Sequence, residues 1–362
     1  MKIYALYLPQ FHETKENNEW WGKGFTEWTN VKKAKPLYKN HVQPKHPLNG
    51  NYYNLLDKST VEWQTKTMKE YGIDAFIYYH YYFNGRKLLE KPAENLLKWK
   101  DVEQPFFFNW ANHTWNRSWK GSKEVLIEQT YGTEKDWREH FEYLLPFFLD
   151  DRYVKIDNRP MFIIYDGSFK EKEQMFKCFD AWCKEAGFDG LHLIEECFNV
   201  ENSALTQFEM NLSSVTKQVY YTEPLIGKSL YLRKSKLNLF KEKVLNKLNQ
   251  KGVIHYTKVY SGNDLLEMSM KKCSCDKDKV IPGLFFEWDN TPRHGNRGFV
   301  ISGISKDMFK RYMNFYKDSS CIVINAWNEW CEGMMLEPTK ENGYKYLEWI
   351  KEWKNSKYDG GL

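Results

Sequence analysis

The sequence lacks the features that mark several classes of protein. Its seven cysteines are scattered and odd in number, and none forms a Cys-x-x-Cys pair, so we expect neither a disulfide framework nor a structural zinc site. No apolar run approaches the length of a membrane span, and no leader precedes the first expected strand. These absences lead us to expect a cytoplasmic protein.

The sequence also gives little support for nucleotides or nucleic acids as ligands. No glycine-rich phosphate-binding loop follows an early strand, which argues against a doubly wound nucleotide-binding sheet. The net charge of +5 is modest and dispersed, so no nucleic-acid partner is expected. We predict neither a cofactor nor a bound metal ion.

Aromatic residues are abundant instead. They make up 17% of the chain, with 15 Trp and 24 Tyr, which exceeds what packing alone requires. Aromatic rings offer flat apolar faces, and a sugar ring can stack its C–H face on them. The composition therefore favours a carbohydrate ligand.

The stretch CIVINAWNEWCEG at residues 321–333 combines a buried strand with a polar and aromatic end. Its first six residues are rich in β-branched side chains, as expected for a short strand in a core. Two carboxylates, an amide and two indoles follow within six positions. These groups cost desolvation if they are buried without partners, so a functional site explains them better than a core does.

Glu329 and Glu332 are three residues apart, so one helical turn or a tight loop brings both carboxyls to one cavity. Glycosyl transfer between saccharides needs such a pair, one group as proton donor and the other as base or nucleophile. Two close acids repel each other, and burial beside indoles raises the pKa of one of them. One carboxyl can then stay protonated near neutral pH.

Eight short apolar segments alternate with helical patterns along the chain. All eight are apolar throughout, which is typical of a parallel sheet, and eight is the number of strands that closes a barrel. We predict the α/β class and a single (β/α)8 TIM barrel over residues 1–362, with long βα loops. The expected strands are 3–8, 75–81, 106–110, 161–165, 191–195, 208–215, 280–286 and 321–326.

Residues 217–279 are predicted to form an insertion in this barrel. Within it, residues 228–251 carry eight Lys or Arg and a single acid, Glu242, interleaved with leucines. Such a basic amphipathic segment can lie on an anionic membrane surface, which would make the protein membrane-peripheral. The preferred interpretation is a solvated helix that packs its leucines on the barrel.

Long motifs in the chain resemble the WbsX family. They include YLPQFH at 7–12, WWGKGFTEWTNV at 20–31, YYHY at 78–81, WAN at 110–112, WDNTPR at 288–293 and WNEWCEG at 327–333. WbsX proteins are described as glycosyltransferases of bacterial surface-polysaccharide synthesis. They are also similar to glycoside hydrolase family 99, the endo-α-mannosidases and endo-α-mannanases, which are (β/α)8 barrels.

This resemblance implies roles for the two acids. Glu329 would be the base that acts on the neighbouring 2-hydroxyl to give an anhydrosugar intermediate, and Glu332 the acid/base of a retaining reaction. The chain departs from the family pattern at two positions. His113 stands where a glutamate is usual, and Glu287 stands where a glycine is usual and could restore the lost charge.

An oligosaccharide or polysaccharide of the bacterial cell surface is the expected substrate, and hydrolysis and transfer both stay open. A non-catalytic glycan-binding barrel is one alternative, and a metal-dependent hydrolase using His12, His80 and His113 is another. The predicted catalytic residues are Glu329 and Glu332. The predicted substrate-binding residues are Tyr7, Gln10, His12, Trp21, Glu27, Trp28, Tyr78, His80, Tyr81, Trp110, Asn112, Trp115, Arg117, Glu287, Trp288, Asp289, Arg293, Trp327, Asn328 and Trp330.

Overall fold

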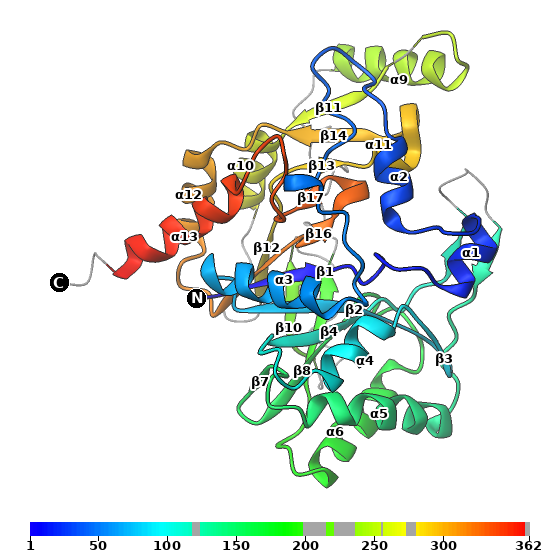
Figure 1. Ribbon diagram of the computed structural model, residues 1–362, viewed down its shortest axis with the longest axis vertical. Coiled ribbons are helices and arrows are strands. Elements are labelled where there is room, and N and C mark those ends of the chain that lie inside the picture. The colour runs from blue at the N-terminus through cyan, green and yellow to red at the C-terminus, as the bar shows by residue number, and fades with distance from the viewer. Residues whose placement is uncertain (118–123, 198–214, 221–235, 255, 273–279, 359–362) are drawn as a thin grey trace.

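The computed structural model describes residues 1–117, 124–197, 215–220, 236–254, 256–272 and 280–358. Eight parallel strands form its centre (Figure 1). They are β1 (Lys2–Tyr7), β2 (Ala75–Phe83), β4 (Phe106–Trp110), β8 (Arg159–Ile164), β9 (His192–Cys197), β10 (Val215–Tyr220), β12 (Val280–Leu284) and β15 (Cys321–Ile324).

Each of these strands pairs with two of the others. The pairs run β1–β2, β2–β4, β4–β8, β8–β9, β9–β10, β10–β12, β12–β15 and β15–β1, all parallel. The first and last of the eight strands are therefore neighbours, with Lys2 opposite Cys321 and Ala5 opposite Ile324. The predicted α/β class is confirmed, and the arrangement is TIM-barrel-like.

The strands form where the sequence is apolar and aromatic. All nine residues of β2 and all four of β15 are buried, as expected for strands covered on both sides. The sixth strand differs from the prediction, because β10 begins at Val215, where the expected strand 208–215 ends. Residues 208–214 lie outside the described part of the chain. β10 contains Lys217 and Gln218, so its apolar signal is weak.

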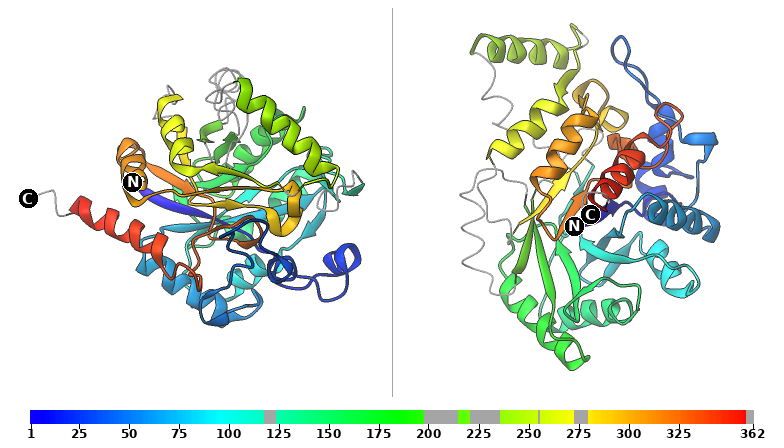
Figure 2. Two further views of the ribbon diagram at one scale, coloured as in Figure 1. Left: turned by 90° about the horizontal axis from the view of Figure 1, so that it is seen from above. Right: turned by 90° about the vertical axis from the view of Figure 1, so that its left-hand side faces the viewer.

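Helices lie on the outside of the strands (Figure 2). Those that follow the strands are α3 (Lys58–Glu70), α4 (Lys91–Lys98), α5 (Glu134–Phe148), α6 (Lys172–Glu185), α12 (Lys306–Phe315) and α13 (Lys345–Tyr358). Helix α13 closes the molecule onto its own beginning, because Lys354 Nζ donates to Asp74, which also accepts from the backbone N–H of Ile3 in β1. Within the described ranges, no helix combines the length and the apolar character needed to cross a bilayer.

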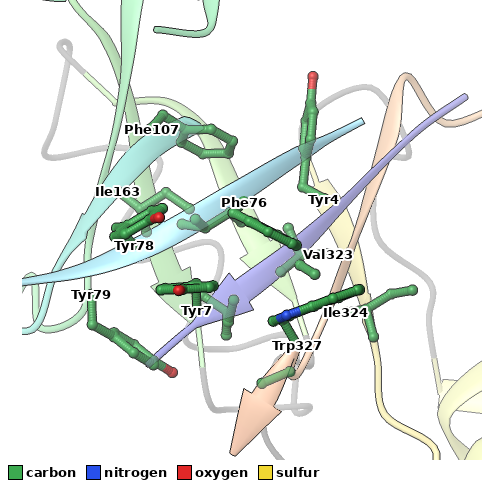
Figure 3. Packing of buried hydrophobic residues seen from close by; sticks show 14 of the residues in the cluster. Tyr4, Tyr7, Phe76, Tyr78, Tyr79, Phe107, Ile163, Val323, Ile324 and Trp327 are labelled. Atoms are coloured by element: carbon green, nitrogen blue, oxygen red, sulfur yellow. The ribbon is translucent and has the colours of Figure 1, made fainter. Parts of the chain in front are cut away.

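A layer of aromatic side chains packs against the strands (Figure 3). Tyr7 stacks on Tyr78 with ring centroids 4.2 Å apart, and Phe76 packs on Trp327 at 4.7 Å. The hydroxyls of both tyrosines are satisfied, since Tyr7 donates to Gln64 of α3 and Tyr78 donates to Gln104. The buried hydroxyls thus lose water without losing hydrogen bonds, which keeps this layer stable.

A second, smaller sheet lies beside the eight strands. It orders β11 (Lys258–Ser261), β14 (Phe299–Ser302) and β13 (Trp288–Asp289), with β11 parallel and β13 antiparallel to β14. β11 comes from the predicted insertion, which in its described part also contains α9 (Lys236–Gln250) and α10 (Gly262–Lys272). The insertion therefore supports β13, whose Trp288 lines the cavity described next.

The remaining described elements are short. They are α1 (Lys15–Trp21), α2 (Glu27–Lys33), η1 (Leu48–Gly50), β3 (Arg86–Leu88), β5 (Trp115–Asn116), β6 (Val125–Ile127), β7 (Lys155–Ile156), α11 (Thr291–His294), η3 (Gly295–Arg297), β16 (Asn328–Glu329), η4 (Trp330–Glu332) and β17 (Met334–Met335).

Candidate active site

A cavity of about 450 Å³ lies at the carboxyl ends of the parallel strands. This is the end at which the loops of a TIM-barrel-like fold build their active sites, and the volume suits a saccharide ligand. The lining residues come from segments far apart in sequence: Leu8, Gln10, Trp21, Tyr79, Tyr81, Ala111, His113, Thr114, Trp115, Asn116, Leu126, Tyr165, Trp288, Arg293, Glu329, Glu332 and Met334.

Glu329 and Glu332 reach this cavity from a small hairpin. β16 and β17 pair antiparallel, and the 3₁₀ turn η4 connects them, so the two carboxyls lie one turn apart. Gly333 ends the turn with φ +64°. A Cβ at this position would lie 2.9 Å from the backbone nitrogen of Asp289, so glycine is needed for the close approach of the two segments.

Arg293 binds both acids with one guanidinium. Its Nη2 lies 3.3 Å from Glu329 and 3.2 Å from Glu27, and its Nη1 donates a hydrogen bond to Glu332. The Arg293 side chain is 8% exposed, and that of Glu27 is fully buried. Burial lowers the pKa of Arg293, but the three carboxylates raise it well above its usual value, so the guanidinium stays charged.

Burial shifts the pKa of the acids upward, whereas it shifts the pKa of Arg293 downward. Desolvation raises the pKa of Glu329 and of Glu332, and Arg293 lowers both only in part. The carboxylate of Glu27 raises the pKa of both acids, and that of Glu332 raises the pKa of Glu329. The cluster therefore holds a proton at a pH where free glutamates would have lost it.

Aromatic side chains form much of the remaining wall. The ring of Trp115 meets that of Tyr81 edge to face at 4.9 Å, and Trp288 is stacked on Phe299 at 5.5 Å. Trp21 joins them from the end of α1. These rings present apolar faces beside the acids, which is the combination that a sugar with C–H faces and hydroxyls requires.

Both predicted catalytic residues and six predicted substrate-binding residues line the cavity. The six are Gln10, Trp21, Tyr81, Trp115, Trp288 and Arg293. Glu27 lies directly behind Arg293 and contacts it. The other predicted residues do not line the cavity.

Four of them are directed away from the cavity by the alternation of side chains along a strand. In β2, Tyr79 and Tyr81 line the cavity, whereas Tyr78 and His80 point to the opposite side, where His80 lies 2.8 Å from His140 of α5. Tyr7 lies on this helix-facing side with Tyr78. Trp110 also packs against His140 and donates its Nε1–H to the carbonyl of Tyr82.

A second group supports the hairpin from behind. Asn328 accepts from the N–H of Leu8 and donates to its carbonyl, so its amide binds the backbone of the segment after β1. Trp330 donates to Glu337 and packs on Trp28, and Trp327 is fully buried. These groups fix the position of Glu329 and Glu332.

Three more predicted residues hold the loops around the cavity. Asn112 donates to the carbonyl of Asp166 and accepts from its N–H. Arg117 donates to the carbonyl of Trp20 and pairs with Glu124, which connects α1 to the β5–β6 hairpin. Asp289 accepts from the backbone N–H and the hydroxyl of Thr291 at the start of α11, the helix that carries Arg293.

The two departures from the WbsX pattern differ in position. His113 lines the cavity with its ring 4.9 Å from that of Tyr165, and burial lowers its pKa, which favours the neutral imidazole. Glu287 does not line the cavity; it binds Lys45 and accepts from the Tyr346 hydroxyl. Glu287 therefore does not restore the missing charge, because it lies in a separate ion pair.

Tyr79, Tyr165 and Met334 line the cavity but were absent from the predicted site. Tyr79 could have been found, since it lies two residues before Tyr81 and so on the same face of β2. Tyr165 directly follows β8, at the carboxyl end of the strand. Met334 carries no chemical signal of this kind in the sequence.

The predicted metal-binding alternative finds no support in the described residues. His12 is buried and its pKa is lowered to about 4 by desolvation, and His80 lies against His140. Among the side chains that the structure describes, no group of three His, Cys, Asp or Glu is arranged to hold a metal ion.

Comparisons with known proteins show the fold and the family to which the chain is similar. The fold is similar to the endo-alpha-mannosidase of glycoside hydrolase family 99 from Bacteroides thetaiotaomicron, with a TM-score of 0.60, 13% identity, and 99% of this chain and 97% of that chain covered. A second structure of that enzyme gives a TM-score of 0.58 at 14% sequence identity. A glycoside hydrolase-like protein gives a TM-score of 0.59 at 13% identity, with 97% and 93% of the two chains covered.

In sequence, the chain is 29% and 30% identical to the WxcX proteins of two strains of Xanthomonas campestris pv. campestris, with 96% of this chain covered. It spans about half the length of these relatives, 48%. The family Glycosyltransferase WbsX matches residues 3–350, nearly the whole chain. The chain therefore belongs to the WbsX glycosyltransferase family, a family of carbohydrate-active enzymes.

Proposed function

We propose that this chain is a retaining enzyme that cleaves or transfers glycosyl groups of a bacterial surface polysaccharide or of its precursor. We also propose that the eight paired strands form a (β/α)8 barrel, which makes residues 1–362 one catalytic domain with an insertion at 217–279. The observation that carries the function is the placement of Glu329 and Glu332 on one cavity, with Arg293 bound to both.

The proposed reaction assigns one proton transfer to each acid. Glu329 in its ionised form takes the proton of the substrate 2-hydroxyl, and that oxygen attacks the anomeric carbon. The bond to the leaving oxygen breaks, and Glu332 gives this oxygen its proton. An acceptor hydroxyl or water then loses its proton to Glu332 and opens the anhydro ring, and O2 recovers its proton from Glu329. Two inversions give net retention.

Arg293 allows one acid to be ionised while the other keeps its proton. Without a cation, burial would keep both acids protonated, and no base would be present. One guanidinium beside three carboxylates compensates only part of their charge, so one proton stays in the cluster while another site is ionised. We expect a bell-shaped pH profile, since low pH protonates the base and high pH removes the proton of Glu332.

The experiment compares Glu329→Gln and Glu332→Gln with the unchanged chain. Products are followed from α-mannosides, the substrate class named for the structural neighbours, and from other surface glycans and sugar nucleotides. We expect each substitution to lower turnover at least about a hundredfold, the range for loss of general acid–base catalysis. The anomeric configuration of the first-formed product, measured by NMR, tests retention.

Glu139→Gln is the matched control, because Glu139 is exposed on α5 away from the cavity. Thermal unfolding shows whether each variant is folded. Unchanged turnover in both cavity variants would overturn the assignment. Glycan binding that survives Glu332→Gln, without product from any donor or acceptor, would identify a glycan-binding barrel instead.

A further inference from the structure

Helix α9 leaves an apolar face uncovered. Leu237, Phe240 and Val244 are 78%, 67% and 41% exposed, and Val253 just beyond the helix is 65% exposed. In Figure 1 and in the right-hand view of Figure 2, α9 lies at the margin of the molecule, at the end opposite to α5 and α6. The expected packing of this segment's leucines on the barrel is therefore wrong for Leu237.

The exposed apolar residues form one stripe. Positions 237, 240 and 244 are spaced by three and four residues, so they lie on one face of the helix. At 100° per residue, Lys241 borders this stripe on one side and Lys243 and Lys247 border it on the other. All three lysines are exposed. The outward face is thus an apolar centre with cationic edges.

The opposite face is attached to the protein. Asn249 donates to the carbonyl of Asn296 in η3 and accepts from the N–H of Tyr256. η3 directly follows α11, which carries Arg293. The contact fixes which side of α9 faces outward, and it connects the helix to an element that lines the cavity.

We propose that this face of α9 docks the protein on the surface of an anionic lipid bilayer. Leu237, Phe240 and Val244 would enter the boundary between headgroups and acyl chains, and the lysines would pair with lipid phosphates. Residues 236–251 contain five lysines and one acid, Glu242, so the charge complements an anionic surface. A protein partner fits less well, because lysine is depleted in protein interfaces whereas membrane-surface helices are rich in it.

This inference goes beyond the proposed function and does not depend on it. Binding to a membrane is measured without any enzymatic reaction.

The test is co-sedimentation of the whole chain with vesicles. We expect binding to vesicles rich in phosphatidylglycerol, little binding to pure phosphatidylcholine, and release as salt approaches about 1 M. Lys241→Glu/Lys243→Glu/Lys247→Glu is expected to lower the partition coefficient at least about tenfold, since each lysine near an anionic surface contributes measurably to binding. Leu237→Ser/Phe240→Ser is expected to weaken binding at all salt concentrations.

Two control variants match these changes. Lys135→Glu/Lys170→Glu/Lys177→Glu reverses three exposed lysines at the α5–α6 end, and Leu149→Ser removes an exposed leucine there. Both should bind as the unchanged chain does. The proposal is overturned if phosphatidylglycerol vesicles do not bind the protein, or if the α9 variants bind as well as their controls. It is also overturned if the protein self-associates and Leu237→Ser/Phe240→Ser abolishes that association instead.

Discussion

Arg293 shows how one side chain sets the chemistry of its neighbours. It is nearly buried and contacts Glu27, Glu329 and Glu332, which come from two distant parts of the chain. Burying a guanidinium costs desolvation energy, which only its carboxylate partners offset. Burying the carboxylates costs desolvation energy as well, which the guanidinium offsets. The four groups therefore stabilise one another and cannot be changed singly without a large effect.

Replacing Arg293 by Met tests this mutual dependence. We expect the free energy of unfolding to fall by about 3–5 kcal/mol, because buried carboxylates lose their only cation among the described contacts. Burial holds the folded-state pKa of Glu329 and Glu332 above the unfolded value, so the acids favour folding at low pH and oppose it as the pH rises. Urea unfolding should show a larger loss at pH 8 than at pH 5.

Arg138→Met is the comparison for this variant. Arg138 pairs with Glu142 and Glu185 on the surface, where ion pairs contribute only about 0–1 kcal/mol. A loss for Arg293→Met that is as small as this, or that does not grow with pH, would show that the cluster is not coupled as described.

At the scale of elements, the hairpin of β16 and β17 carries the two acids, and β13 and α11 carry the residues that face them. The two units meet where Gly333 approaches Asp289. Asp289 itself is bound by His41 and Gln43 from the loop after α2. The geometry of the acids thus depends on a backbone contact as well as on side chains.

Gly333→Ala is expected to disrupt this contact. The added Cβ meets the Asp289 backbone, and φ +64° is unfavourable for alanine, so we expect a loss of about 2–4 kcal/mol in urea unfolding. Gly343→Ala is the matched control, since Gly343 has φ +57° but no atom within 4 Å of the added Cβ. It should lose only about 1 kcal/mol. Equal losses in the two variants would mean that the close approach contributes nothing.

At the scale of the whole molecule, the chain is closed by contacts between its two ends. β1 pairs with β15, α13 reaches Asp74, and Asn328 binds both backbone groups of Leu8 across 320 residues of sequence. Because the cavity takes residues from both ends, it exists only when this closure is complete.

Asn328→Ala should weaken the closure. Leu8 is buried, so its N–H and carbonyl would lose their partners, and we expect unfolding to become easier by about 2–5 kcal/mol. Hydrogen exchange at the Leu8 amide should accelerate. The variant Asn54→Ala removes only a local bond to the N–H of Leu56 and should cost about 0.5–1 kcal/mol. Unchanged exchange at Leu8 would contradict this account.

The sequence by itself determined the α/β class, the positions of seven of the eight strands, and the pair Glu329 and Glu332. Local sequence patterns predict these features, because apolar runs form strands and a spacing of three residues brings two side chains to one turn. It also singled out the aromatic residues Trp21, Tyr81, Trp115 and Trp288, which line the cavity.

Only the tertiary structure decided which polar and aromatic residues face a ligand and which support the loops. Strand alternation places Tyr78 and Tyr81 on opposite faces of β2, but only the folded chain shows that Tyr81 faces the cavity while Tyr78 packs on Tyr7. Asn328 and Asp289 looked like ligand-binding groups, but each satisfies protein partners from distant segments. Burial and partner choice arise from contacts between segments far apart in sequence, and no local pattern encodes them.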